Sequence, residues 1–169
     1  KAVSLIGANL LTAYREPANK AARMNMLTGS YEAGIAFTNA YVGYVHAIAH
    51  GIGGLYHVPH GEANAILLPK VLAAYGSAVY EPLEREVRTS VAEDESREET
   101  DAVLAEAFIE RIRRMNRSMG ISEELAMLRK EDVPELAARA LKEGNPNYPV
   151  PVIWEEEQMR VFLMEQVPK

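Results

Sequence analysis

The sequence HAIAHGIGGLYHVPHGEAN, residues His46 to Asn64, decides how this chain is interpreted. It contains all four histidines of the 169-residue chain, at His46, His50, His57 and His60. Because His46 and His50 are four residues apart, their rings project from the same face of a helix. The spacing raises the question of whether this stretch binds a metal ion.

Glycines follow the histidine pair and predict the end of its helix. Gly51, Gly53 and Gly54 visit left-handed backbone angles cheaply, and each weakens a continuing helix by about 1 kcal/mol. In an uninterrupted helix His46 and His60 would lie about 21 Å apart along the axis, too far to share one ion. We therefore expect the chain to reverse after the glycines, so that these two imidazoles face a common point.

The composition favours one domain that spans residues 1–169. Hydrophobic residues make up 48% and charged residues 25%, and the net charge is −6. A chain of this length buries about two-thirds of its unfolded surface, and the acidic balance argues against nucleic-acid binding. The chain has no cysteine, which excludes disulfides and thiolate sites and indicates a reducing compartment. No run of about twenty apolar residues predicts a membrane span, so we expect a soluble, cytoplasmic protein.

The residue types predict an all-α fold, a helical bundle. Ala, Leu, Glu, Arg and Met dominate the long segments, and period-two alternation is missing. We expect a central helix from Ser30 to His50 that is buried on most sides, because charge is nearly absent after Glu32. Other helices are expected over Val3–Tyr14, from Pro17, beyond Gly61, over Val103–Met119, from Ser122, from Asp132 and over Glu155–Gln166.

Three features are expected to interrupt or connect these helices. Pro69 predicts a kink or a break in the helix after Gly61. The charged residues 84–101 predict a solvated helix end and a connecting loop. The prolines of NPNYPVPVIW, residues 145–154, predict an extended strap.

Two common site types do not fit the central stretch. A zinc-protease helix needs a glutamate directly after its first histidine, and this position is Ala47. A nucleotide-binding glycine loop follows a strand and opens a helix, whereas GIGG is expected to close one. From the residues alone, His46 and His50 are either metal ligands or an ordinary packed or exposed pair.

A larger pattern narrows this choice. The run GYVHAIAHGIGGLYHVPHGEANAILLPKVLAAYG, residues 43–76, resembles the signature of the iron-containing (group III) alcohol dehydrogenases. The segment from Arg113 to Val152, with GISEEL and NPNYPVP, is similar to the end of that family. The resemblance implies the helical, metal-binding C-terminal domain. It also implies that the Rossmann-like N-terminal domain, which binds NAD or NADP in the family, is absent from residues 1–169.

The resemblance assigns roles to the histidines. Carried over position by position, it makes His46 and His60 metal ligands and places His50 beside the nicotinamide and substrate, as a catalytic residue that assists proton movement. His57 would line the pocket or be an exposed loop residue without a chemical role. Fe(II) and Zn(II) both suit such ligands, and either acts as a Lewis acid on the alcohol while hydride passes to NAD or NADP.

The ligand set implied by the family is incomplete in this chain. The family needs an Asp and a His, four residues apart, on a helix before the matched region. No histidine precedes His46, and the first aspartate is Asp94. Two imidazoles alone bind a divalent ion weakly, so we expect the polypeptide not to retain stoichiometric iron and to be inactive alone.

Two functions stay open. One is the metal-binding catalytic part of an NAD(P)-dependent alcohol dehydrogenase, which converts a small-molecule alcohol to an aldehyde or ketone. The alternative is a non-catalytic helical remnant or interaction domain. Apolar surface near the histidines and along the first helix would favour self-association as a homo-oligomer.

Overall fold

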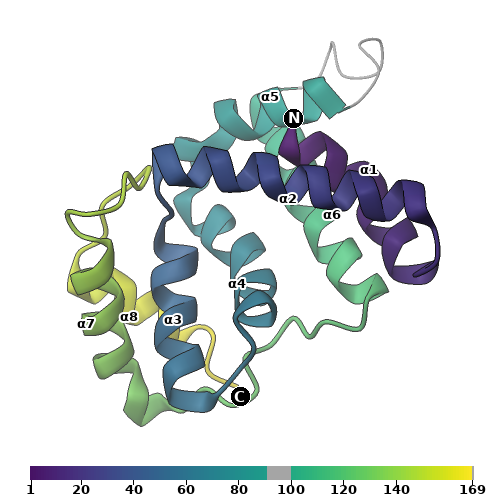
Figure 1. Cartoon of the computed structure of the whole chain (residues 1–169). Helices are drawn as coiled ribbons and strands as arrows, with labels where there is room; N and C mark the ends of the chain where they lie inside the picture. Colours follow the sequence, from purple (N-terminus) through teal and green to yellow (C-terminus); the bar gives the residue numbers. More distant parts are fainter. Residues whose placement is uncertain (91–99, 169) are drawn as a thin grey trace. The chain divides into compact units, whose positions relative to one another are not determined.

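The computed structural model describes residues 1–90 and 100–168. Every regular element in these residues is a helix, which confirms the all-α prediction. In chain order the elements are α1 (Ala2–Arg15), α2 (Lys20–Ala40), α3 (Tyr44–Tyr56), α4 (His60–Tyr75), η1 (Gly76–Val79), α5 (Tyr80–Ser90), α6 (Asp101–Ser118), η2 (Lys130–Asp132), α7 (Val133–Gly144) and α8 (Glu156–Met164) (Figure 1). Within the described ranges, no helix is long and apolar enough to cross a membrane.

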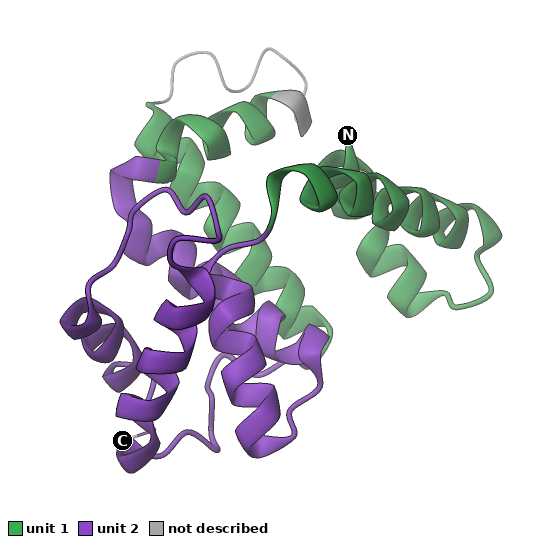
Figure 2. Cartoon of the chain, turned by 60° about the vertical axis from the view of Figure 1, so that its left-hand side comes forward, with its two compact units in different colours: residues 1–41, 79–119 green, residues 42–78, 120–169 purple. Residues whose placement is uncertain are grey.

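The helices form two compact units (Figure 2). One unit contains residues 1–41 and 79–119, and the other contains residues 42–78 and 120–169. In the first unit α1 packs along α2, and α5 packs against α6. In the second unit α3 contacts both α4 and α7, and α7 contacts α8. The single domain over residues 1–169 stays a prediction.

An aromatic cluster holds the start of α3 in the second unit. The Tyr44 ring lies 5.0 Å from the Trp154 ring and 6.4 Å from the Tyr75 ring, between centroids. Trp154 also contacts Phe162 at 5.1 Å. The buried Tyr44 hydroxyl donates a hydrogen bond to Asn145 Oδ1 at 2.8 Å and accepts one from the backbone N–H of Trp154 at 3.1 Å. Such satisfied buried groups fix α3 against the segment before α8.

The predicted central helix Ser30–His50 is wrong. The chain breaks between α2 and α3, where Tyr41 has a φ of 60° and Gly43 is the extended N-cap of α3. The expected burial is wrong for residues 30–40, none of which is buried, and right for the part in α3, where Tyr44, Ala47, Ile48 and Ala49 are buried. Low charge did not predict burial in α2. One face of this helix packs against α1, and large apolar side chains elsewhere on it are exposed.

The glycines expected to end the helix lie inside α3: Gly51, Gly53 and Gly54. At Gly51 the reason is packing, because a Cβ there would lie 2.9 Å from Leu136 Cδ2 of α7. The helix ends later, at a C-cap formed by His57 in the left-handed conformation. The chain reversal that the glycines predicted therefore exists, but His57 and the residues after it produce it.

Other predicted boundaries vary in accuracy. α4 runs through Pro69 without a break. No helix begins at Ser122, whose hydroxyl instead accepts a hydrogen bond from the Glu124 N–H at 2.9 Å. Pro17 lies in a turn, and α2 begins after the Asn19 cap.

Three of the later predictions are confirmed. The helix after Asp132 begins with Pro134 in its first turn, and α6 matches the expected Val103–Met119 helix closely. Residues 145–154 contain no helix or strand, but turns and bends at 145–148 and 151–152 interrupt the extended strap that was expected there. α8 buries the three residues expected to face the core, Met159, Phe162 and Leu163. In the charged segment 84–101, α5 continues to Ser90, and residues 91–99 lie outside the described part.

Candidate functional site

Three of the four histidine rings meet in the second unit. His46 and His50 lie one turn apart on α3, and His60 begins α4. The ring centroids of His46 and His60 are 5.4 Å apart, those of His50 and His60 5.1 Å, and those of His46 and His50 6.1 Å. We call these three residues the histidine cluster. The reversal between α3 and α4 brings together rings that are 14 positions apart in the sequence.

The His46 ring is the most enclosed member of the cluster. Burial lowers its pKa below the ordinary value for histidine, and the neighbouring His60 and His50 lower it further, while Glu143 acts in the opposite direction. A lowered pKa means that His46 is neutral at pH 7. A neutral imidazole offers the nitrogen lone pair that binds a metal ion.

His50 is held from α7. Its Nδ1 lies 2.7 Å from Glu143 Oε1, and the Tyr148 hydroxyl donates a hydrogen bond to the same oxygen at 2.7 Å. Burial and the contact with Glu143 raise the pKa of Tyr148 to about 12, so its hydroxyl keeps its proton and acts as a donor. Glu143 lies 93 residues from His50 in the sequence, and no local pattern in the sequence connects the two residues.

Asn64 fixes His60 from the next turn of α4. Its Nδ2 donates a hydrogen bond to the His60 carbonyl oxygen at 2.8 Å and lies 3.0 and 3.2 Å from the two ring nitrogens. Asn64 Oδ1 is buried and has no hydrogen-bond partner among the described residues. A buried acceptor is therefore available beside the cluster.

His57 lies apart from the cluster. It is exposed at the C-cap of α3, and within the described residues the ring contacts between histidines involve His46, His50 and His60.

The spacing of His46 and His60 fits one shared ion. A metal about 2.1 Å from each nitrogen lies about 3.2 Å from each ring centre, so two ligands at a tetrahedral angle have centres about 5.2 Å apart. The observed 5.4 Å agrees with this value, and so does the 5.1 Å between the His50 and His60 ring centres. Among residues 1–90 and 100–168, however, no group of three or more His, Asp or Glu side chains is arranged to hold an ion.

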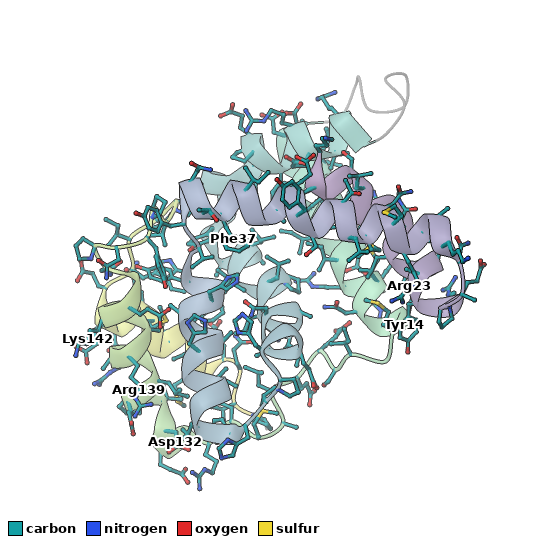
Figure 3. All side chains as sticks on the ribbon, viewed as in Figure 1. Tyr14, Arg23, Phe37, Asp132, Arg139 and Lys142 are labelled. Atoms are coloured by element: carbon teal, nitrogen blue, oxygen red, sulfur yellow. The ribbon has the colours of Figure 1, made fainter. Side chains whose placement is uncertain are left out.

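A surface hollow of about 390 Å³ opens beside His50, between α3 and α7. Its lining residues are Ala47, His50, Gly51, Arg139, Lys142 and Glu143. Arg139 and Lys142 can be followed along α7 in Figure 3. The hollow connects the His50–Glu143 pair with solvent.

Comparison with known proteins gives consistent matches. The model of the C-terminal region of the Fe-containing alcohol dehydrogenase family matches residues 1–166. The 1,3-propanediol dehydrogenase of Citrobacter freundii is 40% identical over 151 residues, which are 86% of this chain and 38% of that protein. The lactaldehyde reductase of Escherichia coli K12 is 39% identical over 137 residues, which are 76% of this chain and 35% of that protein.

Solved structures match over nearly the whole chain. A crystal structure of 1,3-propanediol oxidoreductase has a TM-score of 0.89 and 35% identity, over 98% of this chain and 43% of that one. The alcohol dehydrogenase of Oenococcus oeni has a TM-score of 0.88 and 30% identity, with the same coverage of 98% and 43%. The present chain thus spans about two-fifths of the length of the relatives that it matches.

Proposed function

Since this chain belongs to the iron-containing alcohol dehydrogenase family and corresponds to its C-terminal region, we propose that it supplies the metal-binding part of an NAD(P)-dependent alcohol dehydrogenase. The reaction is the interconversion of a small alcohol and its aldehyde or ketone. His46 and His60 bind the ion, and His50 moves a proton. The convergence of the three rings, with centroids 5.1 to 6.1 Å apart, carries this proposal.

The surroundings of each residue in the histidine cluster suit it to a different role. A divalent ion, Fe(II) or Zn(II), supplies Lewis-acid chemistry that lowers the pKa of a bound alcohol while NAD or NADP accepts hydride. His46 suits ligation because burial keeps its imidazole neutral. His50 suits proton transfer because it is the exposed member on α3 and borders the solvent-filled hollow. Asn64 orients His60 through the contacts along α4.

The proposal requires ligands from outside residues 1–169. A stable site of this kind takes three or four protein ligands, and this chain contributes two. An Asp and a His four residues apart, together with a nucleotide-binding region, complete the proposed enzyme. Reading the coding sequence directly upstream of Lys1 tests this requirement. An in-frame Asp-x-x-x-His supports the enzyme, and a stop codon in its place contradicts it.

A cobalt titration tests the ligand assignment on the chain itself. We expect weak Co²⁺ binding at one site, followed by the visible absorption of the ion, and iron well below one atom per chain after exhaustive dialysis. His46→Ala and His60→Ala should each weaken Co²⁺ binding about tenfold or more. The matched control is His57→Ala, which removes an exposed imidazole outside the cluster. The assignment fails if His57→Ala weakens binding as much as the other two variants.

One observation favours a second candidate function, self-association through a non-catalytic helical domain. α2 exposes large apolar side chains, namely Met24, Leu27, Tyr31, Ile35 and Phe37. Exposed apolar side chains gathered on one helix are typical of interaction surfaces. Sedimentation velocity over a range of concentrations tests this candidate. Leu27→Ser should reduce association if α2 forms the interface, and a chain that stays monomeric at all concentrations excludes it.

A further inference from the structure

We propose that Glu143 is a positioning residue that holds His50 as the tautomer protonated at Nδ1. This leaves the lone pair of the neutral ring on Nε2. The inference about Glu143 concerns the geometry of this chain, and it rests on the proposed function only for what the Nε2 lone pair does there.

The contacts of the Glu143 carboxylate determine where the proton lies. An ionised carboxylate is only an acceptor, so a 2.7 Å contact between Glu143 Oε1 and His50 Nδ1 requires the hydrogen to be on Nδ1. The Tyr148 hydroxyl donates to the same oxygen at 2.7 Å, so this oxygen accepts from both neighbours. In a neutral imidazole with Nδ1 protonated, Nε2 carries the lone pair.

Close packing against α3 also restrains the α7 backbone around Glu143. The next residue is Gly144, where a Cβ would lie 2.7 Å from Cε1 of the buried Tyr44 ring. About two turns earlier, Leu136 meets α3 at Gly51, so α7 approaches α3 closely at two positions along its length. Glu143 lies between these contacts and the exposed side of the helix. A side chain on such a restrained backbone can hold a ring in one orientation.

Because the His50 and Glu143 side chains are partly exposed, their contact contributes more to the orientation of the His50 ring than to the stability of the fold. The His50 and Glu143 side chains are 47% and 33% exposed, so water screens the attraction between them. The same exposure has a use for proton transfer, since the hollow bordered by both residues connects them with bulk water.

Nitrogen NMR of the ¹⁵N-labelled full chain, without metal or substrate, tests the inference. Long-range ¹H–¹⁵N spectra distinguish protonated from unprotonated imidazole nitrogens. The pH is raised until the ring shifts stop changing, so that the neutral form is observed. We expect His50 in the wild type to show a protonated Nδ1 and an unprotonated Nε2. In Glu143→Ala the two nitrogens should exchange these shifts, because water favours the tautomer protonated at Nε2.

Tyr148→Phe is the matched control, since it removes the other partner of Oε1 and leaves the carboxylate. Its His50 shifts should equal those of the wild type, and the His57 shifts should stay constant in every variant. A wild-type His50 protonated at Nε2 overturns the inference, and this measurement needs no variant to fold. A Glu143→Ala tautomer identical to the wild type overturns it as well. Because the samples contain no metal, failure here is distinct from failure of the metal-binding proposal.

Discussion

α2 and α3 both carry many apolar side chains, but they differ in charge and in surroundings, since α2 contains Lys20, Arg23 and Glu32 whereas α3 has no Asp, Glu, Lys or Arg. α2 buries Ala22 and Gly29, whereas α3 buries six of its thirteen residues: Tyr44, Ala47, Ile48, Ala49, Gly51 and Ile52. The difference follows from their neighbours, because α3 packs against both α4 and α7 while α1 is the main neighbour of α2. The histidine cluster is on the helix that is packed from two sides. The more apolar helix is thus also the one that is packed on more sides.

Truncating one isoleucine on each of the two helices should give the largest difference in the free energy of unfolding. Ile48 of α3 is 1% exposed, and Ile35 of α2 is 46% exposed. Ile48→Ala should lower the free energy of unfolding by roughly 2–5 kcal/mol, because it removes buried methyl groups and leaves a cavity. Ile35→Ala should change it by no more than about 0.5 kcal/mol. Urea denaturation measures both values, and similar losses for the two variants would refute the contrast in burial.

Adding a methyl group to a glycine should have effects of opposite sign at two positions. A Cβ at Gly144 would collide with the buried Tyr44 ring of α3, whereas a Cβ at Gly34 of α2 meets nothing within 4 Å. Gly144→Ala should destabilise the chain by about 1–3 kcal/mol through overpacking. Gly34→Ala should stabilise it by up to about 1 kcal/mol through helix propensity. Thermal unfolding checks the signs, and a stabilised Gly144→Ala variant would contradict the close packing of α7 on α3.

Acidic pH should destabilise the packing at the C-terminal end of α3, and this effect should be smaller than those of the substitutions above. The Tyr56 hydroxyl donates to Asp132 at 2.6 Å, and this bond, followed by Arg129, lowers the pKa of Asp132. Its stabilising contribution is present above the pKa of the carboxyl in the unfolded chain and is lost as the pH falls through the lower folded-state pKa. Tyr56→Phe should therefore unfold in acid at a higher pH than the wild type.

Circular dichroism during acid titration measures this shift. Tyr31→Phe is the control on α2, because the Tyr31 side chain is 70% exposed. Equal acid midpoints for Tyr56→Phe and the wild type would show that the hydroxyl does not stabilise the ionised carboxyl.

Local signals in the sequence predicted some elements well. Asp132 followed by Pro134 predicted the start of α7, and the apolar spacing of Met159, Phe162 and Leu163 predicted the buried face of α8. The four histidines within 15 residues predicted a cluster of imidazoles, and three of the four rings do lie together. These signals depend on residues that are close together in the chain, so one sequence is enough to read them.

Tertiary packing caused the errors. The break after α2 depends on Tyr41 at φ 60°, a conformation that a tyrosine does not signal. Gly51 was predicted to end a helix, but it stays helical because Leu136 packs against it. Glu143 escaped notice because only the packing of α7 on α3 brings it to His50. Contacts between residues so distant in the chain have no periodic pattern to reveal them.

The central claim is that His46 and His60 face one point and share an ion, and a zinc titration followed by ¹⁵N NMR tests it most directly. The account predicts that the ring nitrogens of both residues shift together and reach saturation at the same Zn²⁺ concentration, with one ion per chain. It also predicts that His60→Ala abolishes the response of His46. Independent midpoints for the two rings, or a His46 response that persists in His60→Ala, would contradict a shared site.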